Sequence, residues 1–140
     1  MQKKPMLPDV NIWLALTFES HVHHRRAVSW FGGLETLEAA FCRVTMLEFL
    51  RLCQNAAAFP GEAVSAANAW SHYQMLRSDE RVSFQEEPIG IEDLLASHFA
   101  TQKYLSPKTV TDTYLAAFAR LAGQKIHTFD QALQKHPLLK

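Results

Sequence analysis

The stretch that decides the fold is Met6-Leu7-Pro8-Asp9-Val10-Asn11-Ile12-Trp13-Leu14-Ala15-Leu16. It predicts the end of a short buried strand, a turn at Asp9, and an apolar helix over residues 10–18. Asp9 is the only acid in the first eighteen residues. Asp is a preferred N-cap residue, so capping alone explains Asp9. In open α/β sheets, however, ligands bind at this edge, where strands end and helices begin.

The size and charge of the chain limit what it can be. Its 140 residues, 48% hydrophobic and 20% charged, predict one globular domain over residues 1–140. Fourteen basic and fourteen acidic residues give zero net charge, so any RNA contact would depend on local patches. Cys42 and Cys53 lack zinc spacing and are expected to be buried, reduced thiols. No apolar run reaches membrane-spanning length and no signal region follows the start, so we expect a cytoplasmic protein without membrane contact.

Strand and helix patterns alternate along the rest of the chain. Further strands are predicted at 39–44, 82–84 and 125–128, and further helices at 25–31, 45–52, 61–77, 91–101, 109–122 and 129–133. A connector is expected at 56–60 and a loop at 104–108, and the tail 135–140 does not predict a final strand. This order favours the doubly wound α/β class, in which helices cover both faces of a parallel sheet.

Helix 61–77 has the clearest amphipathic pattern. Its expected inner face contains Ala63, Ala66, Ala67, Trp70 and Tyr73. Trp70 and Tyr73 are therefore expected in the core or in a dimer contact.

The histidines at positions 21, 23 and 24 suggest a metal site only superficially. No further ligand is spaced near them, so a solvated helix entry is the better interpretation.

Four acids have both a structural and a chemical explanation. Thr45 and Glu48 match a capping box, and Asp130, like Asp9, matches an N-cap. Asp112 shares the inward stripe of its helix, where a carboxylate is costly to bury unless a cation or N–H donors meet it. Asp9, Glu48 and Asp130 each follow a predicted strand closely. Residues at that position line one rim of a parallel sheet, which Asp112 could also reach.

Four carboxylates at one rim repel one another and need a counter-charge. Mg²⁺ or Mn²⁺ would supply it, because these cations favour oxygen ligands. The sequence contains no glycine-rich phosphate loop and no nucleophile elbow. A metal is then the expected catalyst, and phosphodiester hydrolysis is its natural reaction.

The segments around these acids resemble, in order and spacing, the four acidic motifs of PIN-domain ribonucleases. The resemblance is greatest to VapC toxins of bacterial toxin–antitoxin pairs, and His24, Ala27, Trp30 and Phe31 also resemble one VapC branch. It extends from residue 6 to about 134. The four segments are Leu7-Pro8-Asp9-Val10-Asn11-Ile12-Trp13-Leu14-Ala15-Leu16, Val44-Thr45-Met46-Leu47-Glu48-Phe49-Leu50-Arg51-Leu52, Val110-Thr111-Asp112-Thr113-Tyr114-Leu115-Ala116-Ala117-Phe118-Ala119 and His127-Thr128-Phe129-Asp130.

The resemblance implies a three-layer α/β/α PIN-like fold with a central parallel sheet of four to five short strands. It also implies an Mg²⁺- or Mn²⁺-dependent endoribonuclease that cuts structured RNA such as transfer RNA. Carried over by position, the catalytic acids are Asp9, Glu48, Asp112 and Asp130, of which Asp9 and Asp112 bind metal most directly.

The family pattern makes further implications for this chain. Asn11 and Thr128 match polar positions that support the site. Proteins of this kind are usually homodimers, and a cognate antitoxin commonly blocks the cleft, often through a basic side chain placed among the acids.

Other functions remain open at this level. One is a PIN nuclease that matures RNA without an antitoxin, and another is a non-catalytic PIN-like module that binds RNA or protein. The intact set of acids speaks against the module. A receiver-type phosphorylation domain needs an acidic doublet after the first strand, which Asp9-Val10-Asn11 does not supply. Six basic residues could form a patch for RNA: Arg25, Arg26, Arg43, Arg51, Lys103 and Lys108. Solvated surface charge is the default interpretation for each of them, and Arg51 could instead pair with Glu48.

Overall fold

A parallel sheet of short strands lies at the centre of the computed structural model, which describes residues 4–55 and 63–140. Strand β4 pairs with β1, and β2 pairs with β3. Hydrogen bonds from Met6 N to Glu38 O (2.7 Å) and from Ala40 N to Met6 O (2.9 Å) join β1 to β2. The strand order is therefore β4-β1-β2-β3. The bounds are β1 Leu7–Pro8, β2 Ala39–Phe41, β3 Val82–Phe84 and β4 Ile126–His127.

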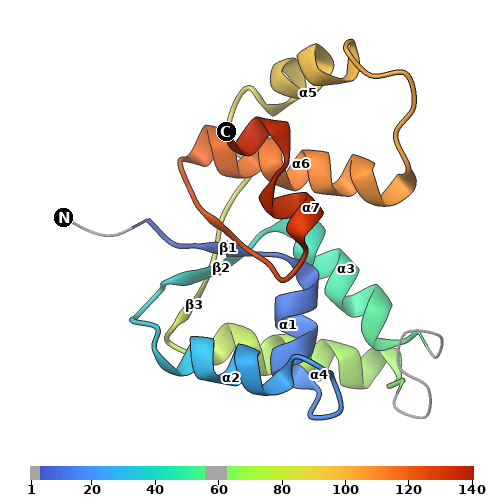
Figure 1. Cartoon of the computed structure of the whole chain (residues 1–140). Coiled ribbons are helices and arrows are strands. Elements are labelled where there is room, and N and C mark those ends of the chain that lie inside the picture. The colour runs from blue at the N-terminus through green and yellow to red at the C-terminus, as the bar shows by residue number, and fades with distance from the viewer. Residues whose placement is uncertain (1–3, 56–62) are drawn as a thin grey trace.

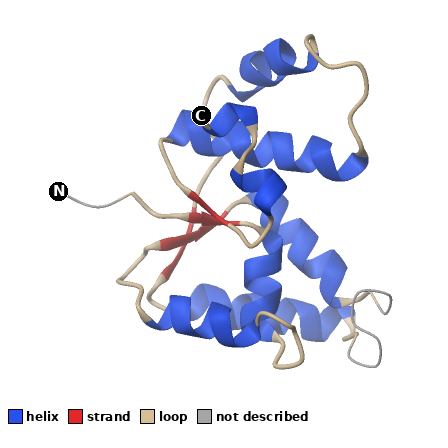
Figure 2. Ribbon diagram, in the orientation of Figure 1, coloured by secondary structure: helices blue, strands red, loops and turns tan. Residues whose placement is uncertain are grey.

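Helices cover both faces of this sheet (Figures 1 and 2). One group is α1 (Val10–Thr17), α2 (His24–Gly32), α3 (Arg43–Cys53) and α4 (Ala66–Ser78). The other group is α5 (Ile91–Phe99), α6 (Pro107–Ala122), α7 (Gln131–Gln134) and the short 3-10 helix Pro137–Leu139. Within the described residues the tail adds no strand, as the sequence predicts.

The two layers have separate cores because side chains of a strand alternate between its faces. Phe41 packs on one face, where its ring stacks on Trp13 at a centroid distance of 3.9 Å and meets Tyr73 edge-on at 5.0 Å. Ala40 packs on the other face in a cluster with Phe118 of α6. This arrangement confirms the predicted three-layer α/β/α fold.

Helix α3 begins earlier than predicted, and the expected Thr45–Glu48 capping box is wrong. The strand ends at Phe41, so Cys42 becomes the N-cap and Thr45 the third helical residue. The Thr45 hydroxyl accepts from Cys42 N at 3.0 Å, so Thr45 completes the cap from inside the helix. Glu48 therefore has no capping role.

The buried face of α4 also differs from the prediction. Ala69 and Tyr73 are buried, whereas Trp70 is 46% exposed. The contact with the sheet follows the four-residue spacing from Ala69 to Tyr73, which places Trp70 at the side of the helix. Part of the predicted helix, at 61–62, and the predicted connector at 56–60 lie outside the described residues.

Two further predictions concern the cysteines and the membrane. Cys42 and Cys53 are free and buried, and burial raises the pKa of both thiols, that of Cys53 to about 12. In the described ranges, no helix has the length and apolar character needed to cross a bilayer.

Candidate active site

Asp9 lies directly after β1 and performs the capping role that its position predicts. Its Oδ1 accepts a hydrogen bond from Ile12 N at 3.3 Å, and its Oδ2 accepts one from the Thr128 hydroxyl. The residue is only 7% exposed. The capping role is confirmed, and the same side chain faces a cleft, where its role at a ligand site stays a prediction.

Thr128 ties the ends of two neighbouring strands together. Its hydroxyl donates to Asp9 and accepts from the backbone N–H of Asp130 at 2.9 Å. The side chain of Gln134 donates to the carbonyl of Thr128 at 2.8 Å. Asp130 in turn caps α7, accepting from Ala132 N at 2.8 Å and Leu133 N at 3.3 Å. This network holds Asp9 and Asp130 in fixed orientations, consistent with the supporting place predicted for Thr128.

A cleft of about 490 Å³ lies between α1, α3 and α6. The predicted residues Asp9, Asn11, Glu48 and Asp112 all line it. Asp130 does not line this cleft but connects to it through a lysine. The structure thus places three of the predicted acids around one opening and the fourth beside it.

Lys108 is the connecting residue. Its Nζ lies 2.8 Å from Asp112 Oδ2 and 2.5 Å from Asp130 Oδ2, so it bridges two acids that are eighteen residues apart in sequence. Burial lowers the pKa of Lys108, but the hydrogen bonds to both acids outweigh it and the pKa is raised. The same contact lowers the pKa of Asp130. Lys108 is the cation that the inward-facing Asp112 requires.

The sequence contained a signal for this contact. Residues 104–108 were predicted to be a loop, but Ser106 is the N-cap of α6 and Pro107 occupies its first turn. Ser before Pro is a typical helix start. Starting the helix there puts Lys108 four residues before Asp112 on one face, which is the spacing of a helical ion pair.

The cleft holds more negative charge than its cations balance. Burial raises the pKa of Asp9, and the charge of Asp112 adds to this effect. Burial also raises the pKa of Glu48, to which Asp112 and Asp9 add, while the positive charge of Arg51 opposes it. Ionising all of these acids together is therefore costly without a further cation.

The donor set of this cleft fits a hard divalent cation. It consists of carboxylate oxygens and the side-chain amide of Asn11, the ligand types that Mg²⁺ and Mn²⁺ favour. Among residues 4–55 and 63–140, no group of three or more His, Cys, Asp or Glu side chains could hold a metal ion by itself. Mg²⁺ commonly binds through one or two carboxylates and keeps several waters. Asp9 and Asp112 meet that smaller requirement.

Among the described residues, the histidines at 21, 23 and 24 are not part of a group of three or more His, Cys, Asp or Glu side chains that could hold a metal ion. His24 Nδ1 lies 2.7 Å from the carbonyl of Ala15, and His21 Nδ1 accepts from His23 N at 3.0 Å, so these rings shape the entry to α2.

The predicted basic residues do not gather in one patch. Arg51 and Lys108 line the cleft, Arg25 and Arg26 lie on α2, Arg43 covers the ring of Phe84, and Lys103 lies over Tyr104.

Comparison with known proteins agrees with this geometry. The PIN domain family model matches residues 6–138. Ribonuclease VapC41 of Mycobacterium tuberculosis is 36% identical over 139 residues, which cover 94% of this chain and 92% of that protein. Ribonuclease VapC38 of the same organism is 31% identical over 128 residues, covering 89% and 84%.

A solved structure shares the fold. The Mycobacterium tuberculosis protein VapC20, described as a sarcin-ricin loop cleaving toxin, superposes with a TM-score of 0.67 over 92% of both chains at 14% identity. The family match over almost the whole sequence and the identity to two VapC ribonucleases lead to one conclusion: the chain belongs to the PIN-domain family, among its VapC-type ribonucleases.

Proposed function

We propose that the protein is an Mg²⁺- or Mn²⁺-dependent endoribonuclease toxin that hydrolyses phosphodiester bonds in structured RNA, such as transfer RNA, in the cytoplasm. The observation that carries this proposal is the cleft between α1, α3 and α6, where Asp9, Glu48 and Asp112 meet and to which Lys108 connects Asp130. Such an acid-rich site suits hydrolysis of an anionic substrate only when cations offset the charge.

Each residue has a proposed role that follows from its contacts. Asp9 and Asp112 hold the metal, and Thr128 fixes the orientation of the Asp9 carboxylate by donating to it. When bound, the metal supplies an activated water for in-line attack and offsets charge on the scissile phosphate. Glu48 and Asp130 complete the set of acceptors around the cleft, and Asn11 contributes a neutral polar group at its rim.

The proposed role of Lys108 follows from its two contacts, with Asp112 and with Asp130. Its single positive charge offsets part of the negative charge of this acid pair, so it keeps this side of the cleft compact before metal and RNA bind. A bound cation would take over part of that neutralisation.

The partners are proposed from the family. The named relative VapC20 is a toxin that cleaves the sarcin-ricin loop, and its similarity to this chain is one of fold. We propose structured RNA as the substrate class here, a cognate antitoxin protein that occupies the cleft, and a homodimer. Light scattering of the purified protein, alone and with the product of an adjacent small gene, tests the last two.

The test of the function is induced expression in bacteria of the wild type beside Asp112→Asn at equal protein levels. The proposal expects growth arrest with discrete RNA ends for the wild type, and neither effect for Asp112→Asn. Equal arrest by both variants would contradict it and favour a binding module. An RNA-maturing nuclease without an antitoxin would give discrete ends without arrest.

A further inference from the structure

A second hollow, of about 500 Å³, lies between α2 and the end of β4. We call it the α2–β4 surface. It is lined by Ser29 and by two arginines and three aromatic rings: Arg25, Arg26, Trp30, His127 and Phe129. The arginines and Trp30 come from α2, and the other two rings come from β4 and the residues after it. None of these side chains has a role in the site described above.

The rings of this surface are held in a stack. Trp30 and His127 lie nearly parallel, 17° apart, with their centroids separated by 4.3 Å. The guanidinium of Arg26 lies over the ring of Phe129 at 4.5 Å. Trp30, His127 and Phe129 are half-buried, which fixes their planes while leaving part of each ring at the surface. Flat rings held in place beside guanidinium groups are the features on which single-stranded nucleic acids stack.

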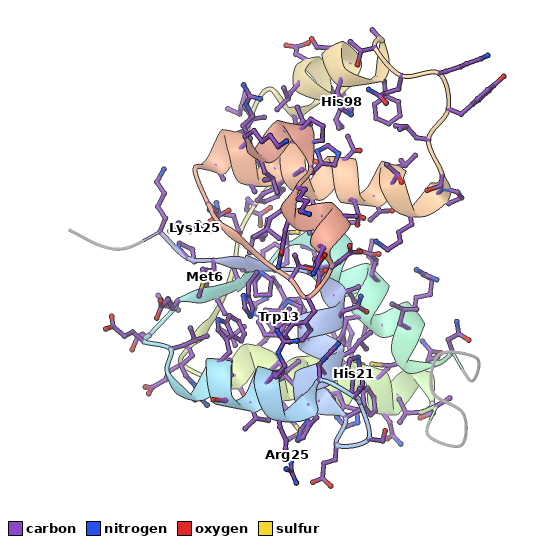
Figure 3. All side chains as sticks on the ribbon, viewed as in Figure 1. Met6, Trp13, His21, Arg25, His98 and Lys125 are labelled. Atoms are coloured by element: carbon purple, nitrogen blue, oxygen red, sulfur yellow. The ribbon has the colours of Figure 1, made fainter. Side chains whose placement is uncertain are left out.

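The charge of this surface suits a phosphate backbone. Arg25 and Arg26 are exposed, and neither forms an ion pair with another residue of 4–55 or 63–140. Figure 3 shows Arg25 projecting outward from the start of α2. Because the whole chain has zero net charge, such local cations are the means by which it can attract RNA.

Three consecutive residues connect this surface with the residues of the acidic cleft. Thr128 donates to Asp9, Asp130 contacts Lys108, and Phe129 between them faces Arg26. Consecutive Cα atoms are about 3.8 Å apart. The backbone of Phe129 is therefore within one residue of Thr128 and Asp130, which places the α2–β4 surface near the acids at the end of β4.

We propose that the α2–β4 surface binds a nucleotide of single-stranded RNA next to the scissile phosphate. Its base stacks on the exposed part of the Trp30 ring, and its phosphates contact Arg25 and Arg26, the second of which is held over the ring of Phe129. This inference rests on the proposed function and adds a place for the substrate beyond the reacting bond. An acidic peptide would satisfy the arginines, but it has no flat group for the fixed rings.

The first test uses tryptophan fluorescence of the full chain carrying Asp112→Asn, titrated in EDTA with a short single-stranded RNA of mixed sequence. Stacking of a base on Trp30 quenches its emission. In the same background, Trp30→Phe keeps an aromatic ring but removes the quench, whereas Trp70→Phe, at an exposed position on α4, keeps it. A quench that persists in Trp30→Phe, or no RNA binding at all, overturns the inference.

The second test measures the arginines by fluorescence anisotropy with the same RNA, labelled at one end. We expect Arg26→Gln to weaken binding about fivefold and to lower the slope of log Kd against log salt by about 0.7, because one phosphate contact is lost. Arg120→Gln removes an exposed charge at the end of α6 and serves as the control with unchanged binding. Equal binding by Arg26→Gln and the control contradicts the inference.

These tests separate the two proposals. Binding without cleavage by the wild type in Mg²⁺ or Mn²⁺ would refute the nuclease function and leave the RNA-binding surface intact. Cleavage by the wild type with no change of RNA affinity in Arg26→Gln would refute the surface alone. An acidic peptide that binds more tightly than RNA, and loses affinity in Arg26→Gln, would reassign the surface to a protein partner.

Discussion

Asp9 shows how one side chain can have two roles without conflict. Its carboxylate caps α1 through Ile12 and is held by Thr128, yet it also lines the cleft. The sequence could predict both roles, because capping and sheet-edge chemistry select the same position after a strand. Lys108 was missed as a site residue, because its contact depends on where α6 begins, and helix boundaries are hard to place from sequence.

Asp9→Asn is expected to make the metal-free protein more stable at neutral pH. Burial raises the pKa of Asp9 in the folded state, so its contribution to stability is full below pH 3.8 and is lost as the pH rises through the folded value. Asn is neutral and caps a helix as well as Asp does, and with its Oδ1 at the cap its side-chain NH2 can donate to the Thr128 hydroxyl. Thermal unfolding in EDTA should give a higher Tm for Asp9→Asn at pH 7, with the difference shrinking toward acid pH.

The same variant should lose its response to metal. Wild-type protein at a metal concentration a hundredfold above Kd gains about 2.7 kcal/mol of stability, and Asp9→Asn gains far less. A lower Tm of Asp9→Asn in EDTA, or an unchanged metal-induced rise, contradicts the account of this residue.

Lys108→Met tests the bridge between two acids. The hydrogen bond from Lys108 is the main reason why the pKa of Asp130 is lowered, so that contribution to stability is present above pH 3.8 and is lost as pH falls through the folded value. Lys108 is 62% exposed, so the loss at pH 7 should be only about 0.5–1 kcal/mol. NMR titration should show the Asp130 pKa moving up toward its ordinary value. Lys103→Met, which removes a nearby exposed lysine, should leave that pKa unchanged.

At the scale of elements, helix α6 determines much of the site, because both Lys108 and Asp112 lie on it. Its N-cap Ser106 accepts from Thr109 N at 3.2 Å, and its C-cap Gly123 has a φ of 67°. The end of the predicted helix 109–122 is correct, because Gly after a helical pattern is a strong stop signal. In α4 the pattern of small and aromatic residues was ambiguous, since alanine fits either a buried or an exposed face.

Ser106→Ala and Gly123→Ala form a matched pair at the two ends of α6. Each should cost about 1 kcal/mol, the first through a lost cap and the second because an L side chain disfavours a positive φ. Only Ser106→Ala loosens the turn that carries Lys108, so only it should also weaken metal binding. Denaturant unfolding and calorimetric titration with Mn²⁺ measure the two effects. Equal loss of metal affinity in both variants would show that α6 acts on the site as a rigid whole.

At the scale of the molecule, the parallel sheet brings together acids from distant parts of the chain. The order of strands and helices predicted this class correctly, because alternating patterns leave few other topologies. The separation into an acidic cleft and an α2–β4 surface could not be predicted, since it depends on which side of β4 each neighbouring residue faces. His127 and Phe129 face α2, and Thr128 between them faces Asp9.

Phe41 is the residue on which one of the two cores depends. It is fully buried against Trp13, Phe49 and Tyr73. Phe41→Ala should cost about 3–5 kcal/mol, a large share of the stability of a domain of this size. Met75→Ala, at an exposed position on α4, should change the free energy of unfolding by less than about 0.5 kcal/mol. Urea unfolding compares them, and similar midpoints would contradict the assignment of this core.

Cleavage of structured RNA by the purified protein, with Mg²⁺ or Mn²⁺ and with EDTA, beside Asp112→Asn, is the decisive test of the metal-dependent active site. The account predicts discrete cleavage by the wild type that needs the metal and falls at least about a thousandfold in Asp112→Asn. Cleavage that persists in EDTA, or that survives in Asp112→Asn folded as well as the wild type, would contradict the assignment of this acidic cleft as a metal-dependent active site.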